Sequence, residues 1–141
     1  STITKNTWNI HFQGLSVTSG SVTAATPAAI TTNNHAEITY TVTLPKPGDF
    51  YEFTVNIVNA GTIAAKTSAA PTLSGNTQSA VMTYTATWSD GTAIAANTTL
   101  AAGASKKIKL RVQYRKDITS SQLPTADTTL TLKFSLPIVQ A

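Results

Sequence analysis

Few residues in this chain have side chains suited to catalysis or metal binding. It contains two histidines, His11 and His35, six acidic residues and no cysteine. The lack of cysteine excludes a disulfide scaffold, a thiolate metal site and a cysteine nucleophile. The histidines lie too far apart for a local metal motif, and no HExxH helix, nucleophile elbow, phosphate-binding loop or calcium loop occurs. We therefore predict no catalytic residue, no metal and no cofactor, and a hydrolase built on His11 or His35 is the least favoured hypothesis.

Glu37 and Glu52 are the remaining candidates for acid–base chemistry. They would act as a carboxylate pair only if two strands brought them together. Both occupy the polar phase of an alternating segment, so we expect both to face solvent. Asn97-Thr98-Thr99 is an N-glycosylation sequon, which matters only in a source that glycosylates such sites.

A basic cluster is the strongest charge feature of the chain, which has a formal net charge of +4. Six of its ten basic residues lie between positions 106 and 116. We predict that Lys107, Lys109, Arg111 and Arg115 project from the outward face of one strand. The simplest interpretation is a solubilising face that also discourages edge pairing.

The functional alternative for the basic cluster is contact with an acidic partner: a neighbouring subunit, an anionic matrix polymer or nucleic acid. Specific nucleic-acid binding is not expected, because Tyr114 is in the inward phase and no exposed aromatic residue is interleaved with the cations.

Trp8 and Trp88 are the candidates for a carbohydrate platform. Each shares the phase of its apolar neighbours, which favours a core position for both.

The elements that carry these residues are predicted to be strands. Threonine, which suits half-buried strands, is the most frequent residue, and only 11% of residues are charged. Apolar and polar residues alternate in a series of segments, the pattern of antiparallel sheets with one buried face. These segments are 7–13, 15–17, 37–44, 51–58, 82–88, 107–114 and 129–136. Residues 24–36 and 64–79 have no clear period and are interpreted as loops or weak strands. Residues 117–123 are interpreted as a site for one helical turn.

The predicted fold is an all-β, antiparallel two-sheet β-sandwich, with no apolar run long enough to insert in a membrane.

The N-terminal segment carries the most functional information. Trp8, Ile10 and Phe12 are large apolar side chains on one face of an extended segment, followed by Gln13 and Gly14. This segment is either the first strand of its own sheet or a donor strand that completes the sheet of an adjacent copy. In the second case Ile3, Trp8, Ile10 and Phe12 are the anchors, residues 1–13 are a separate donor segment and residues 14–141 are a single sandwich domain. Because donor and acceptor are different surfaces, such a contact is head-to-tail and generates a filament.

Residues 44–66 resemble the "KPGD … F.V.N.G...AK" signature of the TasA/camelysin-type secreted proteins, and residues 17–22 resemble their "ASGTL" element. The resemblance implies a jelly-roll-like sandwich secreted by a Gram-positive bacterium or a relative, and matrix fibres formed by N-terminal donor-strand exchange. By position, it places the donor strand at about residues 1–12. Some relatives are described as metalloproteases, but no zinc-binding motif occurs here.

We therefore predict a self-assembling subunit of an extracellular bacterial filament or biofilm matrix fibre, with itself as partner. It would be secreted or at the cell surface, with a leader peptide removed before Ser1. The alternative is a monomeric secreted module that binds cell-wall or matrix carbohydrate through Trp88 or the basic strand.

Overall fold

The computed structural model describes residues 5–22, 24–32, 36–124 and 128–141. In these ranges the chain forms strands and one 3₁₀ turn, η1 (Ser120–Gln122). The strands are β1 (Ile10–Gly20), β2 (Ala24–Thr32), β3 (Ala36–Leu44), β4 (Phe50–Asn59), β5 (Ala65–Thr67), β6 (Thr72–Ser74), β7 (Met82–Trp88), β8 (Thr99–Leu100), β9 (Ser105–Tyr114), β10 (Thr128–Leu136) and β11 (Ile138–Gln140). The prediction of an all-β chain is confirmed, as is the helical turn within residues 117–123.

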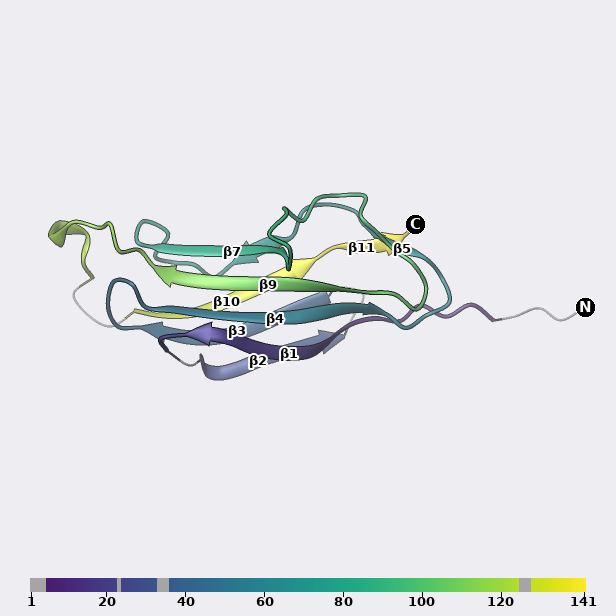
Figure 1. Cartoon of the computed structure of the whole chain (residues 1–141), viewed down its shortest axis with the longest axis horizontal. Coiled ribbons are helices and arrows are strands. Elements are labelled where there is room, and N and C mark those ends of the chain that lie inside the picture. The colour runs from purple at the N-terminus through teal and green to yellow at the C-terminus, as the bar shows by residue number, and fades with distance from the viewer. Residues whose placement is uncertain (1–4, 23, 33–35, 125–127) are drawn as a thin grey trace, which may run out of the picture.

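All strand pairs are antiparallel and form three sheets (Figure 1). Sheet A has the order β1-β4-β9-β7, sheet B the order β2-β3-β10-β6, and sheet C the order β11-β5-β8. Most neighbours are distant in sequence; β3, for example, pairs with β10 along its whole length. The sheet order therefore depends on long-range pairing.

The inward faces of sheets A and B share one hydrophobic core. On β3, β4, β9 and β10, alternate residues are buried, as their period-two patterns predict. Aromatic rings join the two sheets: Phe12 of β1 lies 6.0 Å from Phe134 of β10, and Tyr40 of β3 lies 5.1 Å from Phe53 of β4, measured between ring centroids. The outward faces carry mainly threonine, lysine and other polar residues.

The structure decides two segments of the sequence pattern. Residues 24–32, interpreted as loop or weak strand, form the nine-residue strand β2, which pairs with β3 through an irregular register, so the strand alternative holds. Residues 10–13 of the first alternating run and residues 15–17 of the second lie in one strand, β1, whose pairing with β4 shifts between Gln13 and Ser16. Gly14, at φ 71°, lies in this irregularity, and only glycine adopts such a backbone conformation without strain.

Candidate functional site

The segment before β1 is extended and exposed, and it is bound to the body through the turn that follows β4. Residues 5–9 are all exposed, and Figure 1 shows this segment projecting from one end of the molecule. It runs beside the turn after β4: the Thr62 amide donates to the Thr7 carbonyl at 2.9 Å, and the Ala60 amide donates to the Asn9 carbonyl at 2.8 Å. The Trp8 side chain is 39% exposed. The prediction that Trp8 is a core residue is therefore wrong, because the chain at Trp8 has not yet entered the sheet.

The other predicted donor anchors lie in different environments. Phe12 is buried in the core of its own chain, and Ile10 packs against that core at half-burial. Ile10 and Phe12 pair with Asn59 and Ile57 of β4. Ile3 lies outside the described residues. Since β1 runs through positions 13 and 14, no break in the fold marks the predicted boundary between residues 1–13 and 14–141.

Strand β7 is one edge of sheet A, and part of that edge lacks a pairing partner. The chain's own loops cover both of its ends: the Met82 amide donates to the Gln78 carbonyl at 2.8 Å, and the Trp88 amide donates to the Thr92 carbonyl at 3.0 Å. Backbone groups of alternate residues point to the same side of a strand. The N–H and C=O of Tyr84 and the N–H of Ala86 therefore also point away from β9. No hydrogen bond to them occurs within the described chain. These groups form an open window in the middle of β7.

The inward side chains beside this window are less buried than those of the interior strands of sheet A. Inward residues of β4 and β9 are almost fully buried, whereas Tyr84 and Ala86 are only half-buried. The hydroxyls of Tyr40 and Tyr84 are buried without a hydrogen-bond partner among the described residues. Burial raises the pKa of both phenols far above the ordinary value of a tyrosine. An added strand at the edge of β7 would cover the exposed parts of Tyr84 and Ala86.

The predicted basic cluster lies mainly on the outward face of β9, which is an interior strand between β4 and β7. Protection of a sheet edge is therefore not the role of these charges. Arg111 pairs with Glu52 at 3.3 Å and lies over the Phe50 ring at 4.2 Å. Lys107 and Lys109 have no ion-pair partner in the described part of the chain.

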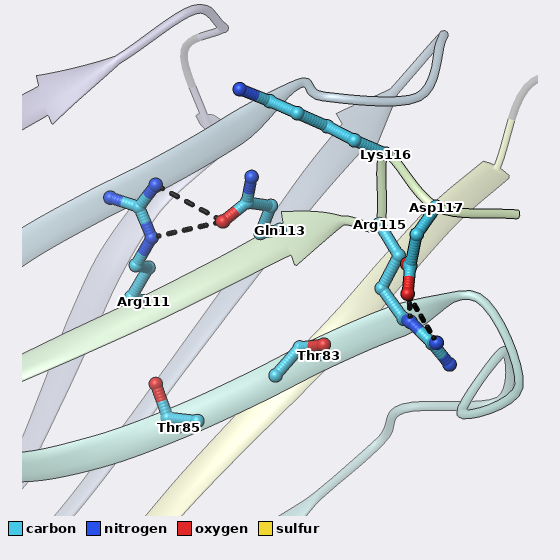
Figure 2. Close-up of a pocket in the computed structure, with 7 residues that line it drawn as sticks. All are labelled: Thr83, Thr85, Arg111, Gln113, Arg115, Lys116 and Asp117. Carbon is cyan, nitrogen blue, oxygen red and sulfur yellow. Dashed lines mark hydrogen bonds and ion pairs between the residues drawn. The ribbon is translucent and has the colours of Figure 1, made fainter.

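Arg115 departs from the predicted pattern, because it follows the end of β9 and is exposed. It binds Asp117 through two hydrogen bonds of 3.1 Å, and this interaction lowers the pKa of the Asp117 carboxyl. A hollow of about 320 Å³ lies beside these residues. Figure 2 shows Arg111 and Gln113 on β9 and Thr83 and Thr85 on β7 among the residues that line it.

Trp88 is not available as a carbohydrate platform. It is only 6% exposed, and the Lys106 ammonium lies over its ring, 4.4 Å from the centroid. The core position predicted for Trp88 is confirmed, and the alternative in which this side chain binds a sugar loses its support.

The candidate acid–base residues do not form a site. Glu37 pairs with Lys133 on sheet B at 3.2 Å, whereas Glu52 pairs with Arg111 on sheet A, so the carboxylates do not form a pair. The His11 ring nitrogens lie 3.0 Å from Asn9 Oδ1 and 3.2 Å from Gln13 Oε1. His35 lies outside the described residues. No cluster of potential metal ligands occurs in the ranges that the structure describes, and no helix in them is long and apolar enough to cross a membrane.

The chain has no significant match among protein-family models, curated proteins or solved structures.

Proposed function

We propose that this protein is a structural subunit of an extracellular filament, and that it polymerises head to tail. In this proposal sheets A and B form a jelly-roll-like β-sandwich, and the N-terminal segment of one copy adds to the open edge of β7 in the next copy. Residues 5–9 with Trp8 are the described part of the donor, and Ile10 and Phe12 remain in their own sheet. The single observation that carries the proposal is the presence, in one chain, of an exposed extended segment and an unpaired edge window.

The two surfaces match in chemistry. In the donor, the backbone groups of Thr7 and the Asn9 carbonyl already bond to residues 60 and 62 of their own chain. The backbone groups of Asn6 and Trp8 point to the other side of the segment, and they are the ones that would pair with the open N–H and C=O of Tyr84 and the open N–H of Ala86. Covering the exposed part of the Trp8 indole against the half-buried Tyr84 would add on the order of 2 kcal/mol. The window is short, which suits a donor of about five residues.

Their placement favours an open polymer. Residues 5–9 project from one end of the long axis, and β7 lies away from that end (Figure 1). Contacts between two different surfaces are heterologous, and they produce a filament when the rotation between copies does not close a ring. The low proportion of charged residues, 11%, reduces the repulsion between copies.

The test uses two complementary variants. Deletion of residues 1–9 removes the donor but leaves β1 and the core intact. Ala86→Pro removes the open N–H of the acceptor edge and no hydrogen bond to β9, a change that edge strands tolerate. We expect each variant to be folded by circular dichroism and to form no filaments in electron micrographs, while the parent chain does.

Mixing provides the matched control. The deletion variant can only accept and Ala86→Pro can only donate, so an equimolar mixture should give dimers, and no longer species, in sedimentation. Filaments of the deletion variant would refute the donor segment, and filaments of folded Ala86→Pro would refute the β7 edge. If Ala86→Pro does not fold, an excess of a synthetic peptide of residues 5–9 should stop elongation of the parent chain. Elongation that continues in saturating peptide would also refute the β7 edge.

A further inference from the structure

We propose that the outward face of β9 binds a linear acidic polysaccharide that lies along the strand. This inference concerns a different surface from the assembly contact and holds for the single chain. Its core is a row of cations on alternate residues, Lys107, Lys109 and Arg111, which a strand spaces at about 7 Å. A chain with regularly repeated anionic groups matches such a row.

Two of these cations are available to a partner. Lys107 and Lys109 make no ion pair within the described residues, while Arg111 shares its charge with Glu52. Cations outnumber carboxylates on and beside this face. The cations are Lys107, Lys109, Arg111, Arg115 and Lys116, and the carboxylates are Glu52 and Asp117. The face therefore carries most of the chain's net charge of +4, and it attracts anions.

The strand register adds hydrogen-bonding groups on both sides of the cations. Lys109 is paired with Thr54 and Lys107 with Asn56, both of β4, and Arg111 is paired with the exposed Thr85 of β7. Hydroxyl and amide side chains bind sugar hydroxyls, which a simple polyanion lacks. Exposed aromatic side chains, on which nucleic-acid bases stack, do not line this row, because Phe50 is half-buried under Arg111. These neighbours favour an acidic polysaccharide over a single-stranded nucleic acid.

Two hollows mark the ends of the row. The first, of about 320 Å³, is lined by Arg111, Gln113 and Arg115, among others (Figure 2). The second, of about 330 Å³, is lined by Gln13, Asn56 and Ser105, among others. Ser105 and Gln113 share the phase of the cations on β9, so the row joins one hollow to the other over about 27 Å. A ligand of several sugar units would fill this length.

The experiment measures binding of the full chain to a polyuronate, with neutral dextran as the reference polymer, by isothermal titration calorimetry. The double variant Lys107→Gln/Lys109→Gln should bind the polyuronate about tenfold more weakly than the parent chain, and its affinity should depend less on salt. The matched control is Lys66→Gln/Lys133→Gln, which removes the same charge from sheets C and B and should bind as the parent does. Asn56→Ala should weaken binding without changing its salt dependence.

Three results would overturn the inference: no binding of the polyuronate, an equal loss in the two double variants, or equal binding of dextran. Tighter binding of a single-stranded oligonucleotide, lost in Lys107→Gln/Lys109→Gln, would assign the face to nucleic acid instead. Calorimetry of the deletion variant lacking residues 1–9 measures binding to the same face of β9 in the absence of the proposed donor segment. Failure of the filament proposal and failure of this inference can therefore be distinguished.

Discussion

At the scale of single residues, Asn59 connects the core to the segment that we propose as the donor. Its side chain is 1% exposed and donates to the carbonyls of Ile63 at 2.8 Å and Leu100 at 3.0 Å, while its Oδ1 accepts from the Gly61 amide at 3.1 Å. These bonds shape the turn beside which Thr7 lies. A buried amide with all these partners is costly to remove, because several backbone groups would lose their hydrogen bonds.

We expect Asn59→Ala to lower the free energy of unfolding by about 3 kcal/mol. Asn59→Asp should be at least as harmful, since a carboxylate would face the two carbonyl oxygens that now accept from Nδ2. Asn56→Ala, on the outward face of the same strand, is the control and should change the free energy by less than about 0.5 kcal/mol. Urea denaturation measures all three, and equal losses at positions 56 and 59 would contradict the role given to Asn59.

At the scale of elements, the contact between β6 and β10 depends on Gly75. This residue directly follows β6, has φ +92°, and lies so close to β10 that an added Cβ would overlap the Thr131 carbonyl oxygen. Gly91 has the same backbone conformation, φ +91°, but an added Cβ there meets nothing within 4 Å. Comparing alanine substitutions at Gly75 and Gly91 therefore separates the cost of backbone strain from the cost of a steric clash.

Gly91→Ala should therefore cost about 1 kcal/mol, from the positive φ alone. Gly75→Ala should cost about 3 kcal/mol or more, because β6 must also move away from β10. Thermal unfolding monitored by circular dichroism compares the two variants, and similar melting temperatures would show that the close approach at Thr131 is not required.

At the scale of the whole molecule, tyrosines at the junction of the two large sheets couple folding to pH. The ring centroids of Tyr40 and Tyr84 lie 6.3 Å apart, and those of Tyr40 and Tyr51 lie 6.0 Å apart. Burial raises the pKa of all three phenols above the ordinary value of about 10. In the unfolded chain they lose their protons near pH 10, whereas in the folded chain they keep them. Their contribution to stability is therefore complete below pH 10 and is lost as the pH rises above it.

We predict that the free energy of unfolding falls between pH 9.5 and about pH 11, and that the fall is shallower in Tyr40→Phe/Tyr84→Phe. Near pH 7 this variant should be as stable as the parent chain or more stable, because the hydroxyls it lacks are buried without partners in the described structure. Urea denaturation of both chains across this pH range is the measurement, and lysine titration is common to both. Parallel stability curves would contradict the prediction.

Much of the fold could be predicted because a period of two is local information. The alternating segments 37–44, 51–58, 82–88, 107–114 and 129–136 correspond closely to β3, β4, β7, β9 and β10. Strand β2 could not be found in this way, since residues 24–32 are mainly alanine and threonine without alternation and become a strand by pairing with β3.

The properties of the candidate sites could not be predicted from local sequence patterns alone. Trp8 and Phe12 share a phase in the sequence, yet only Phe12 reaches the core, because β4 offers a pairing partner from Ile10 onward. Likewise, the sequence presents Lys107, Lys109 and Arg111 as equivalent, but the register places Glu52 beside Arg111 alone. The open window of β7 could not be predicted from the sequence, because it depends on which strand lies at the edge of the sheet.

The amino-acid sequence by itself determined that the chain is all-β, where most strands run and which face of each is buried, because side chains alternate along any extended backbone whatever its partners. Only the tertiary structure decided the strand order, the unpaired edge of β7, the exposure of Trp8 and which cations pair with a carboxylate among the described residues. These properties belong to pairs of segments far apart in the chain, and the hydrogen bonds and charges that define them exist only after the segments have met.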